Sequence, residues 1–331
     1  MASAYMTAGL AAQANKLMRS GDHSEALNAY RSLKASTGLS SWDWNIRTLE
    51  VRLETDRTVF LRKEFGDILS GRAGIERIYI ANLRHRNDRK RRVILELAKF
   101  GISPADFDII EAVNGFRDSS ALELFEHFKN ADPAKYESLR TAPQQALEYD
   151  RSHSSPGVIG YLLTQELIIK DALSKNYRKI LVLDDDVFFS SQACELTYRF
   201  FKQALDWRIV HLGSSEHSPR DSHIFQTKLD QAASAGYYNP IPYNTCGSFA
   251  VAYDKAVLEK LLQLVTEYVG VFDRSVLSYF YTQMPGLCFT LRPAACCADV
   301  ADSDIREPRI MTDNAARMGW DISRYAEYLD G

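Results

Sequence analysis

The sequence predicts an α/β domain, with a mostly parallel sheet flanked by helices, behind a small all-helical extension. From residue 75 onward, apolar strand-like segments alternate with segments of helical periodicity, a rhythm typical of right-handed βαβ units and a parallel sheet. Residues 180–183 are consecutive aliphatics, as in a central strand that is buried on both faces. The residues before 75 show helical periodicity and almost no strand pattern. We therefore divide the chain into a helical segment, 1–70, and an α/β domain, 71–331.

The helical segment contains one recognisable hairpin. Apolar residues at helical spacing precede and follow a turn at Gly21-Asp22, so two antiparallel helices are expected. The unit resembles a tetratricopeptide repeat in the residues Ala14, Leu17, Gly21, Asp22, Glu25, Ala26, Leu27 and Tyr30. A stable array needs roughly three such units. We therefore interpret residues 1–70 as a cap or docking element, for a protein partner or a membrane surface.

The composition is that of an ordinary globular protein, with 46% hydrophobic and 25% charged residues in a chain of 331. A net charge of -3 provides no basic field for nucleic acid, so nucleic-acid binding is not expected. The five cysteines are odd in number and form no C-x-x-C pair, which argues against a disulfide framework or a zinc site. Neither a signal peptide nor about eighteen continuous apolar residues occur. We expect a cytoplasmic protein, with peripheral association with the inner face of a membrane left open.

The predicted central strand runs directly into three carboxylates, Asp184, Asp185 and Asp186. Adjacent carboxylates repel one another, and burying them is unfavourable unless a cation lies between them. Strand alternation predicts that Asp184 and Asp186 share one side and that Asp185 faces the other. Two carboxylates at a strand end form a hard oxygen site, suited to Mg²⁺ or Mn²⁺ that carries phosphates. The alternative is an acidic surface loop, although such loops more often contain Gly, Pro, Ser or Asn.

A run of basic residues follows the first predicted strand, which covers residues 75–83. The run extends from Arg84 to Arg92 and leads into a helix. Bases at a helix start oppose the helix macrodipole, and a nearby anionic phosphate would offset this cost. On the basic run alone, a solvated basic face is the preferred interpretation.

Several segments match the motifs of one family in order along the chain. They are Asn82-Leu83 with Arg86 and Arg89, Gly157-Val158-Ile159-Gly160, Leu183 to Val187, Asp206 to Gly213, Gly247 to Ala250, Asp273, and Ser303-Asp304-Ile305. In this order they resemble glycosyltransferase family 25, which includes bacterial lipooligosaccharide galactosyltransferases and procollagen galactosyltransferases. The resemblance extends over about residues 75–309 and leaves out the helical segment.

The resemblance implies a GT-A-type fold, a UDP-sugar donor with galactose favoured, and Mn²⁺ or Mg²⁺ as cofactor. It implies transfer, with inversion, to a glycan or peptide acceptor in lipopolysaccharide or other glycoconjugate synthesis. The residues that it places near the nucleotide are Asn82, Leu83, Arg86 and Arg89. Asp185, which strand alternation turns away from the metal side, would face the sugar or a basic partner. The residues that it places at the metal are Asp184, Asp186 and Asp304.

An inverting transfer needs a carboxylate that takes the proton of the acceptor hydroxyl. Asp273 is the first choice, because it follows the apolar pair Val271-Phe272, where burial would raise its pKa. A helix N-cap is an equally weighted alternative for Asp273. Asp302 and Asp304 are the other candidates for the base. His211, at a strand end, is interpreted as a structural histidine rather than a metal ligand.

The sequence departs from the family pattern at three places. Val158 stands where the family commonly has Glu, Thr164-Gln165 replaces a Ser-His pair, and Asp184 replaces Glu. The shorter acid keeps its charge but draws it back from the metal. The lost Ser-His pair keeps open a non-catalytic adaptor, built from a degenerate transferase and the helical hairpin. A metal-dependent phosphatase with Asp184 as nucleophile is a weaker alternative, because Phe188 and the late position of the motif do not fit that class.

Overall fold

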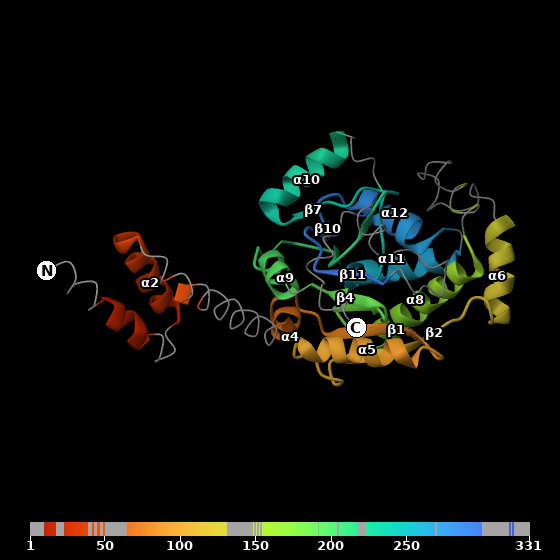
Figure 1. The fold of residues 1–331 in the computed structure, drawn as a ribbon. Coiled ribbons are helices and arrows are strands. Elements are labelled where there is room, and N and C mark those ends of the chain that lie inside the picture. The colour runs from red at the N-terminus through yellow and green to blue at the C-terminus, as the bar shows by residue number, and fades with distance from the viewer. Residues whose placement is uncertain are drawn as a thin grey trace, which may run out of the picture. The chain divides into compact units, whose positions relative to one another are not determined.

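The computed structural model describes most of the chain from residue 65 to residue 299 and part of the region before it. The described ranges are 10–17, 23–38, 65–130, 154–190, 192–203, 205–217, 223–268 and 270–299, with residues 42, 45, 46, 49, 148, 150, 152, 318 and 320. The chain separates into two compact units, residues 1–63 and residues 64–331 (Figure 1). None of the helices within these described ranges combines the length and the apolar character that crossing a bilayer requires.

The first unit contains a helix at residues 10–17 and helix α2 (His23–Thr37). Their shared core includes Ala14, Ala26, Leu27 and Tyr30, which are residues of the repeat-like sequence pattern. The Tyr30 hydroxyl also donates a 2.6 Å hydrogen bond to the Asn15 side chain and so joins the two helices. The two helices therefore pack through the residues that carry the periodicity, and the tetratricopeptide-like assignment stays a prediction.

The second unit is built on a seven-stranded sheet of order β2-β1-β3-β9-β5-β10-β7. Strands β2, β1, β3, β5 and β10 run in one direction, whereas β9 and β7 run in the other. The predicted α/β class with a mostly parallel sheet is confirmed. The strands are β1 (Arg77–Leu83), β2 (Phe107–Ala112), β3 (Lys179–Asp184), β5 (Ile209–His211), β7 (Tyr237–Tyr238), β9 (Ala250–Asp254) and β10 (Cys288–Leu291).

Helices cover both faces of this sheet. Apolar residues of β1, β3 and β9 at alternate positions form one core with α8, α11, η5 and α12. On the other side of β1, helix α5 contacts β1 and β4 (Figure 1). The helices are α4 (Phe65–Asp67), α5 (Asn87–Lys99), α6 (Ser119–Asn130), α8 (Pro156–Ser174), α9 (Ala193–Phe201), α10 (His223–Ala235), α11 (Lys255–Thr266) and α12 (Leu277–Gln283), with π-helical turns η2 (Ile68–Arg72) and η5 (Phe272–Val276).

Two short strand pairs lie outside the main sheet. They are β4 (Val187–Phe189) with β11 (Cys296–Ala298), and β6 (Ser215–Glu216) with β8 (Thr245–Cys246). The sequence of residues 246–253 predicts one strand, but the structure divides it between β8 and β9, with residues 247–249 between them. Gly247 has φ +84°, a left-handed conformation that favours glycine, and this breaks the extended backbone.

Candidate functional site

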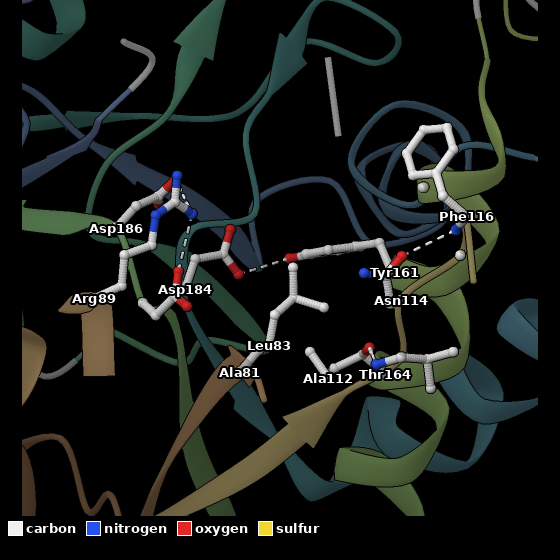
Figure 2. A pocket seen from close by; sticks show the side chains of 14 residues that line it. Ala81, Leu83, Arg89, Ala112, Asn114, Phe116, Tyr161, Thr164, Asp184 and Asp186 are labelled. Carbon is white, nitrogen blue, oxygen red and sulfur yellow. Dashed lines mark hydrogen bonds and ion pairs between the residues drawn. The ribbon is translucent and has the colours of Figure 1, made fainter. Parts of the chain in front are cut away.

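A pocket opens at the edge of the sheet where β1, β2 and β3 end, beside the first turns of α8 (Figure 2). The strand register joins these ends, because Leu83 pairs with Ala112 and Ala81 with Asp184. The pocket contains about 650 Å³ of space, a figure that includes its open mouth. Ligands of α/β sheets commonly bind outside the carboxyl ends of the strands. The lining includes the three acids of the turn and also Leu83, Arg89, Asn114, Phe116, Tyr161 and Thr164.

One wall of the pocket is formed by close contact between α8 and the loop after β2. A Cβ atom on Gly115 would lie 1.9 Å from the Pro156 carbonyl oxygen, and one on Gly160 would lie 2.5 Å from that of Val113. The Thr164 hydroxyl accepts a 2.9 Å hydrogen bond from the Val113 amide and donates a 2.7 Å bond to the Gly160 carbonyl. Small residues and one hydroxyl thus fix the loop against the first two turns of the helix.

Asp184 ends β3 and meets hydroxyl groups. The Tyr161 hydroxyl lies 3.3 Å from Asp184 Oδ1 and 2.7 Å from the Ser248 hydroxyl. The Asp184 amide donates a 2.9 Å bond to the Phe249 carbonyl, which fixes the backbone of the turn to the residue before β9. Burial raises the pKa of Asp184 well above its ordinary value, and repulsion from Asp186 adds to this shift.

Asp185 and Asp186 instead meet an arginine. Arg89, on α5, is 6% exposed and places Nη1 3.2 Å from Asp185 Oδ1 and 3.5 Å from Asp186 Oδ2. Asn82, at the end of β1, donates a 2.6 Å bond to the other Asp185 oxygen. Burial raises the pKa of Asp186 to about 7, although Arg89 opposes this shift. Asp185 thus contacts a basic partner, one of the two expected possibilities. The prediction that Asp185 faces away from Asp186 is wrong, because both contact the same arginine. Strand alternation does not apply to them, since β3 ends at Asp184 and the next two residues form a turn.

A second arginine and a fourth acid lie beyond Asp186. Arg92, three residues after Arg89 on α5, places Nη1 3.1 Å from Asp299 Oδ2 and its guanidinium 4.5 Å from the centre of the Phe188 ring. The Asp299 amide donates a 2.9 Å bond to the Asp186 carbonyl. The sequence did not point to Asp299 as a site residue, because only the pairing of β11 with β4 brings it beside the turn.

Asp273 lies in η5 and is joined to the same region through residues 247–248. Its Oδ2 accepts a 2.8 Å hydrogen bond from the Gly247 amide, next to the Ser248 that bonds Tyr161. The N-cap alternative is wrong, because the capping position of η5 is held by Val271 and Asp273 lies within the turn. The role of Asp273 as a base stays a prediction.

Asp150 joins η5 from the segment before α8. It is 2% exposed, accepts a 3.0 Å bond from Arg274 Nη1, and also accepts a hydrogen bond from the Ser275 hydroxyl. Burial raises its pKa to about 6, against the effect of both partners. No motif or periodicity in the sequence around Asp150 indicates its burial.

A second, more open hollow adjoins the pocket and shares the ends of β1 and β2. The two have Leu83, Ala112, Val113 and Asn114 in common. The outer hollow adds Arg84, His85 and Arg117 to its lining, together with Glu111 and Asp118. The groove thus passes from a strongly acidic inner part to a part of mixed charge.

A family model described as "Glycosyltransferase family 25 (LPS biosynthesis protein)" matches residues 75–244, which is half of the chain. The chain belongs to glycosyltransferase family 25. This family segment includes β1, β2 and β3, the acidic turn and the wall formed by α8.

Curated relatives of this family 25 chain match part of it. Procollagen galactosyltransferase 2 of Mus musculus is 28% identical over 144 residues, 42% of this chain and 21% of that protein, and the Homo sapiens protein is 27% identical over the same length. The "Probable inactive glycosyltransferase 25 family member 3" of Bos taurus is 21% identical over 168 residues, 50% of this chain and 26% of that protein. The chain spans about a fifth of the length of the procollagen galactosyltransferases that it matches.

Solved structures of two glycosyltransferases are distantly similar. One is described as involved in glycosylation of the major capsid of PBCV-1, with TM-score 0.33, 12% identity, and coverage of 73% of this chain and 97% of that chain. The other is mouse xyloside xylosyltransferase 1, with TM-score 0.32, 13% identity, and coverage of 65% and 72%.

The family motif at the end of β1 is divided between the pocket and its support. Leu83 and Arg89 line the pocket. The side-chain amide of Asn82 bonds Asp185 and the Arg86 carbonyl, and the Arg86 side chain pairs with Asp88 at 2.8 Å. Asn82 and Arg86 thus do not line the pocket, and contact of these four motif residues with a nucleotide stays a prediction.

The family positions that depart in this chain have different surroundings. Thr164 retains a hydroxyl and uses it in the pocket wall. Gln165 is 1% exposed, and within the described residues its side-chain amide has no hydrogen-bond partner. His211 is fully buried with Nε2 2.7 Å from the Tyr281 hydroxyl, consistent with a structural role. Asp302 and Asp304 lie outside the described residues.

The acidic turn of this family 25 chain fits a hard divalent cation in its donor chemistry. Asp184 and Asp186 line the same pocket, and each has a raised pKa because burial disfavours its charge. A cation between the two carboxylates would offset the cost of burying their charge and remove their mutual repulsion. Within the described ranges, no three His, Cys, Asp or Glu side chains are grouped to form a complete protein cage. The remaining ligands would therefore come from phosphate oxygens and water, as is usual for Mg²⁺.

Proposed function

We propose that this chain is a metal-dependent glycosyltransferase, which moves a sugar from a UDP-sugar donor to a glycan or peptide acceptor. The observation that carries the proposal is the pocket at the carboxyl ends of β1, β2 and β3, with Asp184 and Asp186 in its lining. The membership in family 25 supports transferase chemistry. Galactose is the favoured sugar, because the procollagen galactosyltransferases are relatives of the chain.

The chain's residues would act on the diphosphate of the donor. Asp184 and Asp186 would hold Mn²⁺ or Mg²⁺, which stabilises the negative charge that develops on the leaving nucleoside diphosphate. Arg89, within 3.5 Å of Asp186, adds positive potential on the α5 side. The first turn of α8 borders the pocket at Gly157, and a helix N-terminus favours anionic groups.

Asp273 is the proposed base for an inverting transfer. Repulsion from Asp273 contributes to the raised pKa of Asp184, so the two carboxylates are close enough to interact. Residues 247–248 lie between them, since Gly247 bonds Asp273 and Ser248 bonds Tyr161. An acceptor hydroxyl placed on this side of the sugar would transfer its proton to Asp273 as the new bond forms. Asp302 and Asp304 remain the other candidates for this role.

A non-catalytic adaptor is the second candidate function. Two observations favour it: the buried, unpartnered amide of Gln165, and the similarity to a bovine protein described as probably inactive. Residues 1–70 would then provide the partner contact. The phosphatase alternative has no comparable support, because the family match covers the acidic turn.

A panel of nucleotide sugars tests the proposal by thermal shift and by Mn²⁺-dependent hydrolysis. A ligand that binds the folded state stabilises it by mass action, so the true donor should raise the melting temperature most. We expect Asp186→Ala to lower hydrolysis by about 100-fold or more. Asp106→Ala, an exposed acid before β2 at the far end of the strand, should retain the rate.

Two results would contradict the proposed transferase activity. Full turnover in Asp186→Ala would exclude the metal role of that residue. A wild-type chain that neither hydrolyses nor is stabilised by any nucleotide sugar would favour the adaptor. For the intact enzyme we propose a role in lipopolysaccharide or other cell-surface glycoconjugate synthesis, at the cytoplasmic side of the membrane.

A further inference from the structure

Tyr161 stands out among the pocket residues because it contacts both acid-bearing elements of the site. It projects from the second turn of α8 toward the end of β3, where its hydroxyl lies 3.3 Å from Asp184 Oδ1 (Figure 2). The aromatic ring of Tyr161 packs edge-on against the ring of Phe272, with ring centres 5.6 Å apart. Phe272 immediately precedes Asp273 in η5. One side chain therefore contacts the acidic turn and the element that carries the proposed base.

The hydrogen bond from Tyr161 distinguishes Asp184 from the other two acids of the turn. Within the described residues, Tyr161 is the one side chain that donates a hydrogen bond to Asp184. The neighbouring acids are held by Arg89 instead. A phenol fixes the direction of a carboxylate without neutralising it, so the charge of Asp184 remains available to a cation.

Ser248 fixes the direction of the Tyr161 hydroxyl in turn. Its Oγ lies 2.7 Å from Tyr161 Oη, and its carbonyl oxygen lies at 3.3 Å. Ser248 precedes Phe249, whose carbonyl accepts the Asp184 amide. The Tyr161 hydroxyl is therefore held by the same segment that holds the backbone of the turn. The tyrosine does not belong to the family motif that the sequence matched at the start of α8.

We propose that Tyr161 is a positioning residue. Its hydroxyl orients the Asp184 carboxylate toward the cation site, and its ring, packed on Phe272, fixes the position of that carboxylate relative to η5. This inference rests on the proposed function, since it assigns Asp184 to a divalent cation. Hydrogen-bond partners that orient metal ligands typically change metal affinity or activity by 10- to 100-fold when they are removed.

The test compares two tyrosine substitutions that remove the same kind of bond. Tyr161→Phe removes the hydroxyl and keeps the ring against Phe272. Tyr79→Phe is the matched control, because the Tyr79 hydroxyl donates a 2.5 Å bond to Asp171, a carboxylate outside the pocket lining. Mn²⁺ affinity is measured by calorimetric titration of the full chain with UDP and without it, and stability by urea unfolding. The KM for Mn²⁺ and kcat are then measured in the hydrolysis assay.

We expect Tyr161→Phe to weaken Mn²⁺ binding about tenfold or more, chiefly as a higher KM for Mn²⁺, while Tyr79→Phe binds as the wild type does. Ser248→Ala should weaken binding in the same direction by a smaller factor, and it serves as the test if Tyr161→Phe does not fold. Equal Mn²⁺ affinity in the wild type and in Tyr161→Phe would overturn the positioning role and leave the proposed function standing. Equal losses in Tyr161→Phe and Tyr79→Phe would overturn it as well, as a general effect on stability. A wild-type chain that binds no Mn²⁺ would overturn the metal site itself.

Discussion

The three buried carboxylates of the acidic turn are stabilised in two different ways, one on the arginine side (Asp185 and Asp186) and one on the hydroxyl side (Asp184). Asp185 and Asp186 lie against Arg89, a buried cation supplied by the chain itself. Asp184 lies against the hydroxyl of Tyr161, which directs the carboxylate and leaves its charge uncompensated. The pKa of each of the three acids is raised, chiefly by burial, so neither arrangement fully replaces water. A bound cation should therefore stabilise Asp184 more than it stabilises Asp185 or Asp186.

The largest effect is expected from removal of the arginine side. Arg89→Met keeps the length of the side chain but leaves Asp185 and Asp186 buried without their cation. Loss of one partner of a buried pair should lower the free energy of unfolding by roughly 3 kcal/mol, measured by urea denaturation of the metal-free chain. Arg91→Met, on the exposed face of the same helix, is the control and should cost less than about 1 kcal/mol. Equal stability of the two variants would show that the arginine and hydroxyl sides do not differ as described.

Asp150 provides a second comparison, because this buried acid is also paired with an arginine, and burial and pairing shift its pKa in opposite directions. Asp150 is paired with Arg274, yet burial raises its pKa from 3.8 to about 6. Between these values the unfolded chain has lost the proton and the folded chain keeps it, so the free energy of unfolding falls as pH rises. The fall from this one group is on the order of 3 kcal/mol.

Asp150→Asn should remove this part of the pH dependence, seen by urea denaturation at pH 4 and pH 6.5. Asp118→Asn is the control, because hydrogen bonds from Ser120 and the Ala121 amide lower the pKa of Asp118, which places its titration below this window. The same decline in Asp150→Asn and in the wild type would mean that the arginine, and not burial, dominates at Asp150.

The smallest effect is expected at the pocket wall next to Tyr161, where α8 contacts the loop after β2. Gly160 precedes Tyr161, and a Cβ there would lie 2.5 Å from the Val113 carbonyl oxygen and 2.6 Å from the Gly115 amide nitrogen. Gly160→Ala should therefore lower the free energy of unfolding by about 1–3 kcal/mol and raise the KM for the donor as the wall moves. Gly71→Ala, with no atom within 4 Å of the new methyl group, should be neutral or slightly stabilising. A Gly160→Ala variant with unchanged stability and KM would mean that the loop and helix can separate without disturbing the pocket.

Much of the fold followed from the sequence alone. The strand into the acidic turn and the first strand with its basic helix lie near their expected positions. These are segments whose apolar residues repeat at the period of one element, so local pattern and final structure agree. The expected strand at residues 246–253 was wrong in its middle, where left-handed Gly247 divides it.

The site was predictable only in part. Its acids were visible because three adjacent carboxylates in an apolar setting are unusual. Tyr161, Asp150 and Asp299 were not anticipated, because each is an ordinary residue type outside the matched motifs. Ser248 lies within the matched segment from Gly247 to Ala250, but no role had been predicted for it. Asn82 and Arg86 belong to the expected motif, but their side chains support Asp185 and pair with Asp88 instead of lining the pocket.

By itself, the sequence determined which chemistry is present: a buried strand that ends in carboxylates, a basic helix after the first strand, and the ordered motifs of a transferase family. These are local properties, carried by residue type and spacing. Only the tertiary structure decided which acid meets an arginine and which meets a hydroxyl. Tyr161 bonds an acid 23 residues away, Arg89 one 96 residues away, and Ser275 one 125 residues away. Contacts at such separations depend on how strands and helices pack, and no local pattern of residues encodes them.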